Sequence, residues 1–124
     1  MTIVAAGITL HEALSAAQAL AEEGISARVV DCYSVKPIDA AGLSAHAEAT
    51  GAILTVEDHW PEGGLGEAVL TALATLDERP KVQILAVAGM PGSGKPAELL
   101  AAAGIDAEHI ADAARKLVRA AALR

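Results

Sequence analysis

The sequence predicts an α/β protein built on a parallel, doubly wound sheet. Short apolar runs rich in Val and Ile alternate with longer segments whose apolar residues recur at helical spacing. Glycine, proline or aspartate separates most of these segments. Strands that alternate with helices favour right-handed crossovers and therefore parallel strands. With 124 residues the chain can form one hydrophobic core, so we interpret residues 1–124 as a single domain.

The N-terminal half is predicted to contain a strand, a helix, a strand and a helix, at residues 2–6, 10–23, 25–30 and 40–50. The first helix begins with Thr9-Leu10-His11-Glu12, which matches the S/T-x-x-E capping box. Gly24 supplies its left-handed end. Asp39 is the expected N-cap of the second helix.

The C-terminal half continues the alternation, with strands at residues 52–56 and 81–87 and helices at residues 65–76 and 96–103. Pro96 suits the first position of its helix, and Gly104 ends that helix. Asp106 is then expected to cap a final helix that extends to about residue 122.

Composition excludes several classes of protein. The net charge of −7, without any basic run, argues against binding to nucleic acid or to anionic membranes, and favours a cytoplasmic protein. Cys32 is the only cysteine, which excludes an internal disulfide and favours a small buried side chain. Hydrophobic residues make up 53% of the chain, which is also consistent with one face being buried against a partner of unspecified kind.

Ionisable side chains follow the first and third predicted strands. In the usual strand order 2-1-3-4, the carboxyl ends of these strands flank the ligand-binding crevice, with His11 and Glu12 on one side and Glu57, Asp58 and His59 on the other. A His–carboxylate pair there could act as a general base or bind a divalent metal. Alternatively, Glu12 completes the capping box, and Glu57 or Asp58 caps loop amides. Without a nearby nucleophile we assign no catalytic, cofactor-binding or metal residue.

The loop after the third strand contains Trp60, Gly63, Gly64 and Gly66. Bare amides at a helix start can bind phosphate, but the first strand lacks the dinucleotide fingerprint, so a tight turn and close packing are the favoured roles of the glycines. Trp60, the only Trp, covers the domain's own core or forms an interface, and we favour the interface.

Residues 89–95 match the first seven positions of a P-loop. The eighth position should be Ser or Thr, but Pro96 has neither a hydroxyl nor an amide proton. Nucleotide hydrolysis is therefore a third, weaker hypothesis.

Four ordered blocks together resemble the C-terminal domain of transketolase: residues 5–14 (AAGITLHEAL), 35–39 (VKPID), 56–59 with 63–68 (VEDH and GGLGEA) and 93–100 (SGKPAELL). One departure is Gly92, where the family usually has Arg before Ser-Gly-Lys-Pro. A phosphate-binding role for this loop is therefore not expected.

The resemblance implies a three-layer α/β/α domain with strand order 2-1-3-4. The family adds an antiparallel edge strand beside the second strand, from sequence upstream of this chain, so an exposed sheet edge is expected here. Transketolases of the pentose phosphate pathway are homodimeric transferases that move a two-carbon ketol unit between sugar phosphates. They use thiamine diphosphate and a divalent metal (Mg or Ca). Their cofactor and catalytic residues belong to the preceding domains, so this chain alone is expected to be inactive and without a cofactor.

The resemblance also implies partners, namely the thiamine diphosphate-binding domains of a parent transketolase. The candidate interface or crevice residues are His11, Glu12, Glu57, Asp58, His59, Trp60, Gly63, Gly64 and Gly66. The alternative is a stand-alone module that binds a small molecule or a metal in the crevice near His11 and His59.

Overall fold

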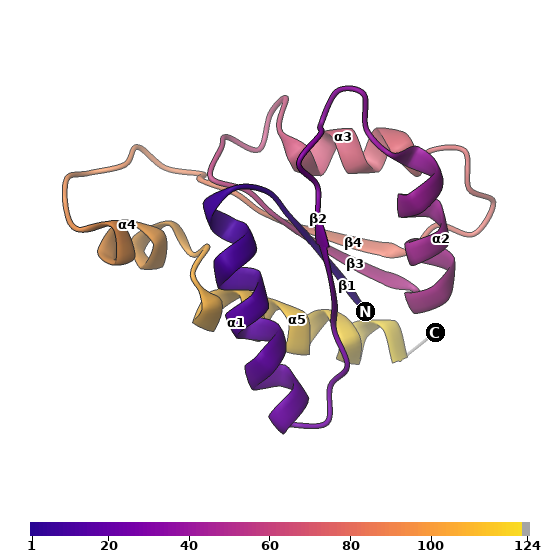
Figure 1. Cartoon of the computed structure of the whole chain (residues 1–124), viewed down its shortest axis with the longest axis horizontal. Helices are drawn as coiled ribbons and strands as arrows, with labels where there is room; N and C mark the ends of the chain where they lie inside the picture. The colour runs from indigo at the N-terminus through magenta and orange to yellow at the C-terminus, as the bar shows by residue number, and fades with distance from the viewer. Residues whose placement is uncertain (123–124) are drawn as a thin grey trace.

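The computed structural model describes residues 1–122 and places a four-stranded sheet between two layers of helices (Figure 1). The strands are β1 (Thr2–Ala5), β2 (Arg28–Asp31), β3 (Ala52–Val56) and β4 (Lys81–Leu85). The helices are α1 (Ile8–Glu22), α2 (Ala40–Thr50), α3 (Leu65–Ala72), α4 (Pro96–Ala103) and α5 (Ala107–Ala122). All strand pairs are parallel and the order is β2-β1-β3-β4. The predicted fold class and strand order are confirmed.

The two inner strands supply most of the core. Helices α1 and α5 cover one face of the sheet, and α2 and α3 cover the other (Figure 1). Ile3 and Leu54 point toward α1 and α5, whereas Val4 and Ile53 point toward α2 and α3, because successive strand residues face opposite sides. All four side chains are fully buried, and each contributes about 1.5–3 kcal/mol to stability.

Small side chains allow α1 and α5 to pack closely. The contact between these helices is lined by buried alanines: Ala13, Ala16, Ala111, Ala113 and Ala114. At one end of the helix pair, Nε and a terminal nitrogen of Arg115 donate to the two carboxylate oxygens of Glu23 at 2.9 and 2.6 Å. Small aliphatic side chains therefore build a core that contains almost no aromatic residues.

Strand β2 begins later than predicted, because the residues that precede Arg28 complete the C-terminal end of α1. The amide of Gly24 donates to Ala21 at 3.0 Å, and the amide of Ile25 donates to Leu20 at 2.9 Å. Gly24 has φ of 78°, so it ends the helix in the left-handed region as predicted. Ile25 completes this helix end instead of starting the strand, and regular pairing with β1 begins at Arg28.

Two further boundaries differ from the prediction over residues 65–76 and 81–87. Helix α3 ends at Ala72, after which the amides of Ala74 and Leu76 donate to the third residue before them, as in tight turns. Regular pairing in β4 ends at Leu85.

The predicted caps of α2 and α5 are present. Oδ1 of Asp39 accepts from the amide of Gly42 at 2.9 Å, and Oδ1 of Asp106 accepts from the amide of His109 at 3.0 Å. The outer side of β2 has no neighbouring strand within residues 1–122, so this sheet edge is open as expected. No helix in the described part of the chain is long and apolar enough to cross a membrane.

Candidate functional site

The carboxyl ends of the parallel strands form one edge of the sheet, where the sequence placed the candidate site. Thr9 lies inside α1 rather than at its N-cap, which is Gly7 without a side-chain cap. The buried hydroxyl of Thr9 lies 2.9 Å from the carbonyl oxygens of both Ala6 and Val56, which share its one proton. The predicted capping box is therefore wrong, because Thr9 already lies within α1 and its hydroxyl ties the helix to the end of β3.

Glu12 caps a different helix from the one predicted. Its Oε2 accepts a hydrogen bond from the amide of Ala107, 95 residues later, at 2.8 Å. Glu12 therefore satisfies a free amide at the start of α5. The neighbouring residue His11 is exposed on α1. Sequence spacing could not have identified this partner, since α5 reaches α1 only through the tertiary fold.

Glu57 is the most buried charged side chain at this edge, with an exposed fraction of 3%. Its Oε2 accepts from the amide of Leu65 at 2.6 Å, and its Oε1 accepts from the amide of Gly66 at 2.9 Å. A carboxylate at the start of a helix satisfies free amides and interacts favourably with the helix dipole. Glu57 does accept from backbone amides, as one alternative proposed, but these amides belong to the start of α3 and not to the loop before the glycines. The amides of Leu65 and Gly66 are therefore not free to bind phosphate.

The glycines of this loop serve close packing, as the sequence favoured. A Cβ atom on Gly64 would lie 1.9 Å from Oε2 of Glu57 and 2.8 Å from the carbonyl oxygen of Trp60. A Cβ atom on Gly66 would lie 2.6 Å from Cδ1 of Ile84. Both positions therefore exclude any side chain unless their neighbours move.

The predicted crevice does not bring the two histidines together. A cavity of about 280 Å³ lies beside Glu57, Asp58 and His59, but neither His11 nor Glu12 lines it. Nδ1 of His59 lies 2.8 Å from the carbonyl oxygen of Trp60 and 3.9 Å from Oε2 of Glu57. Within residues 1–122, no group of three or more His, Cys, Asp or Glu side chains could hold a metal ion.

In the segment that resembles a P-loop, the amide at the start of the following helix is already bonded. Oε2 of Glu98 accepts from the amide of Lys95 at 3.0 Å, at the start of α4. A carboxylate therefore occupies the place where a phosphate would need free amides.

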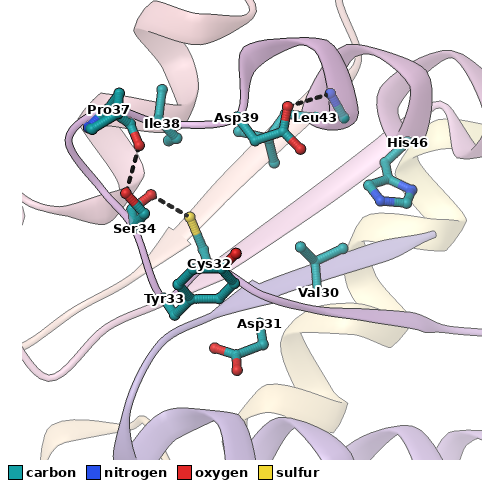
Figure 2. Close-up of a pocket in the computed structure, with 11 residues that line it drawn as sticks. Val30, Asp31, Cys32, Tyr33, Ser34, Pro37, Ile38, Asp39, Leu43 and His46 are labelled. Carbon is teal, nitrogen blue, oxygen red and sulfur yellow. Dashed lines mark hydrogen bonds between the residues drawn. The ribbon is translucent and has the colours of Figure 1, made fainter.

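A second cavity, of about 410 Å³, lies between β2 and α2, and sequence reasoning missed it (Figure 2). The thiol of Cys32 points into it and donates to the carbonyl oxygen of Ser34 at 3.6 Å, while the hydroxyl of Ser34 donates to Pro37 at 2.6 Å. Burial, and then the charges of Asp31 and Asp39, raise the pKa of the Cys32 thiol. A protonated thiol is a poor nucleophile, so Cys32 is not set up for covalent chemistry.

Apolar side chains at the carboxyl edge point outward. Within residues 1–122, seven large hydrophobic side chains are exposed, and two of them, Leu14 and Leu70, lie on helices beyond the first turn. The other five lie in the segments that follow the strands, namely the first helical residue of α1, Ile8, and the residues Tyr33, Val35, Trp60 and Met90. We call these five side chains the apolar edge. Trp60 is 46% exposed and Met90 is 87% exposed.

A groove adjoins the apolar edge. It has a volume of about 500 Å³ and lies between Trp60, Met90 and the α4 residues Leu99 and Leu100. Sequence reasoning identified only Trp60 in this surface. The other members share one recognisable feature, since each is a large apolar residue in the segment that follows a predicted strand.

Comparisons with known proteins identify relatives of the whole domain. The family model for the transketolase C-terminal domain matches residues 1–110. Transketolase-like protein 1 of Bos taurus is 52% identical over 119 residues, which cover 95% of this chain and 20% of the relative. Transketolase of Homo sapiens is 50% identical over 121 residues, covering 95% of this chain and 19% of the relative. The chain therefore spans about a fifth of the length of these relatives.

A solved structure agrees with the sequence comparisons. The inactive β4 tetramer of a split-gene transketolase superimposes with a TM-score of 0.89 and 42% sequence identity, covering 95% of this chain and 39% of that chain. The resemblance inferred from the four sequence blocks is confirmed. This chain belongs to the transketolase C-terminal domain family.

Proposed function

We propose that this chain is the non-catalytic C-terminal domain of a transketolase. In this proposal it packs against the thiamine diphosphate-binding domains of the parent enzyme and contributes to a dimer. The parent enzyme is cytoplasmic and transfers a two-carbon ketol unit between sugar phosphates. The relatives are about five times longer than the matched segment, which leaves room for such domains.

The observation that carries this proposal is that, at the carboxyl edge, three polar side chains point inward whereas five large apolar side chains are exposed. The side chains of Thr9, Glu12 and Glu57 turn inward and hold helices in place. The apolar edge turns outward, and its side chains are between 40% and 89% exposed. Exposed Trp and Met beside an apolar groove are typical of protein interfaces.

The residues present do not fit a thiamine diphosphate and metal site. The carboxylates of Glu12, Glu57 and Asp106 each accept from a backbone amide at a helix start. Within the described residues, no group of three or more His, Cys, Asp or Glu side chains could hold a metal ion. We therefore place the chemistry of the parent enzyme outside this chain.

Two measurements test the proposal. Calorimetric titration of the purified chain with thiamine diphosphate and Mg²⁺ is expected to show no binding. Biolayer interferometry is expected to show association with human transketolase from which the matched segment has been deleted. Trp60→Ser should weaken this association at least about tenfold, because interface Trp residues often contribute 2 kcal/mol or more.

Leu70→Ser is the matched control, because Leu70 is 45% exposed but lies on α3 outside the apolar edge. It is expected to leave the association unchanged. Cofactor binding by the isolated chain, or equal effects of the two substitutions, would contradict the proposal.

Small-molecule binding is a second candidate function, favoured by the cavity of about 280 Å³ beside Glu57 and His59. If a small molecule binds in this cavity and raises the melting temperature, His59→Ala should abolish that rise. His11→Ala should preserve the rise, since His11 does not line this cavity. Equal rises for both variants would exclude this cavity as the site.

A further inference from the structure

The loop that carries Trp60 is tied to the chain after β4. We call residues 58–64, between β3 and α3, the Trp60 loop. The amide of Val87 donates to the carbonyl oxygen of His59 at 2.9 Å. The ring of His59 in turn lies 2.8 Å from the carbonyl oxygen of Trp60. The first half of the loop is therefore fixed to the segment that follows β4.

A separate bond fixes the second half of the Trp60 loop. The amide of Gly63 donates to Oε2 of Glu67 at 2.7 Å. Gly63 has φ of 72°, and Gly64 follows it. Because glycines have wide backbone freedom, a loop that ends in this pair would move readily without such a bond. Glu67 is exposed in the first turn of α3, so it can be replaced without opening the core.

We infer that Glu67 is a positioning residue for Trp60: its carboxylate holds Gly63 and so orders the Trp60 loop before any partner binds. The benefit of this order rests on the proposed function. A loop that is already ordered loses less conformational entropy when it docks, which strengthens association. Glu57 has a different task, since its buried carboxylate holds the start of α3 itself.

The test uses the full chain without a partner. In Glu67→Ala, hydrogen exchange of the Gly63 amide, followed by NMR, should be about tenfold faster, which corresponds to one net hydrogen bond. Trp60 is the only Trp in the sequence, so time-resolved fluorescence anisotropy reports its motion directly. In Glu67→Ala, the fast component of the Trp60 anisotropy decay is expected to have a larger amplitude. Glu67→Gln should restore both values toward wild type because its side-chain oxygen can still accept from Gly63.

Glu108→Ala is the matched control. Glu108 is also an acidic residue in the first turn of a helix, and its carboxylate accepts no hydrogen bond within residues 1–122. Glu108→Ala therefore shows how much of any change comes only from removing a favourable negative charge at the start of a helix. If Glu67→Ala changes neither the exchange of Gly63 nor the anisotropy of Trp60 relative to this control, the inference is wrong.

The association measurement then tests the consequence for docking. Glu67→Ala should weaken binding to the truncated human transketolase about tenfold, mainly through faster dissociation. Unchanged affinity despite a loosened Trp60 loop would overturn the positioning role. If the wild-type chain does not associate at all, the proposed function fails, whereas the measurements on the isolated chain still decide the ordering role of Glu67.

Discussion

Replacing Glu57 with Gln is expected to destabilise the domain by about 2–4 kcal/mol. The carboxylate is 3% exposed and uses both oxygens, toward the amides of Leu65 and Gly66. A Gln side chain has one accepting oxygen and an NH₂ group, so one amide at the start of α3 would face a donor. Losing a hydrogen bond to a charged acceptor costs about 1.5–3 kcal/mol, and the unpaired buried amide adds roughly another 1 kcal/mol.

Circular dichroism followed during thermal and urea unfolding measures this change. For a domain of this size, 1 kcal/mol shifts the melting temperature by roughly 3–5 °C, so a decrease of about 10 °C is expected. The urea midpoint should fall while the slope of the unfolding free energy against urea stays the same, because the core that becomes exposed on unfolding is unchanged.

Glu62→Gln provides the control, since it makes the same chemical change in the Trp60 loop at an exposed residue. The carboxylate of Glu62 accepts no hydrogen bond within the described part of the chain, so the expected change is within about 0.5 kcal/mol. Equal stabilities of Glu57→Gln and Glu62→Gln would refute the conclusion that the Glu57 carboxylate holds the start of α3.

Three further changes are expected to alter stability. Gly66→Ala should cost about 1–3 kcal/mol in urea unfolding, because the new Cβ would lie 2.6 Å from Cδ1 of Ile84. Thr55→Val should stabilise the fold by about 1 kcal/mol in the same assay, because the buried Thr55 hydroxyl has no hydrogen-bond partner within residues 1–122. The hydrogen bond that the ring of His109 donates to the carboxylate of Asp106 raises the pKa of His109 above its ordinary value of 6.5. Protonated His109 therefore adds stability that is fully present below pH 6.5 and is lost as pH rises through the raised pKa, so His109→Gln should lower the urea midpoint more at about pH 5.5 than at about pH 8.5.

Each of these expectations has its own control. Gly92→Ala should be nearly neutral, because a Cβ there meets no atom within 4 Å. Thr2→Val should destabilise by about 1 kcal/mol, since the Thr2 hydroxyl is bonded to that of Thr50 at 3.0 Å. The pH-dependent effect of His109→Gln should vanish in a chain that also carries Asp106→Asn. Equal costs for the two glycine changes, a destabilising Thr55→Val, or a His109 effect independent of pH and of Asp106 would contradict the respective explanation.

The order of elements and the strand order followed from the sequence because local patterns determine them. Asp39, Gly24 and Gly104 mark helix ends through local hydrogen bonds and left-handed backbone, so their positions were predictable. The predicted boundary was wrong where residues that look like the start of a strand instead complete the end of the preceding helix. Ile25 is apolar enough for a strand, but its amide completes the end of α1.

The polar contacts of the candidate site were less predictable, because their partners are distant in sequence. Thr9 and Glu12 match a capping box, yet the hydroxyl bonds to Val56 and the carboxylate to Ala107. A local motif and a tertiary contact compete for the same side-chain atoms, and only the fold decides between them. Glu57 was easier, since its partners are eight and nine residues later and a glycine pair brings the chain back toward it.

Because tertiary contacts use these side-chain atoms, ionisable residues at the strand ends do not indicate a catalytic or metal site in this domain. Where a tight glycine turn brings a helix start within reach of a strand-terminal carboxylate, two amides and the helix dipole bind that carboxylate without any loss of translational entropy. A metal or a substrate would have to displace both bonds, as at Glu57. Recognition at the same edge is then left to side chains that these bonds do not hold, and within residues 1–122 these include the five exposed apolar side chains of the apolar edge. We therefore expect substitutions at Trp60 and Met90 to change association more than stability, and substitutions at Glu57 to do the reverse.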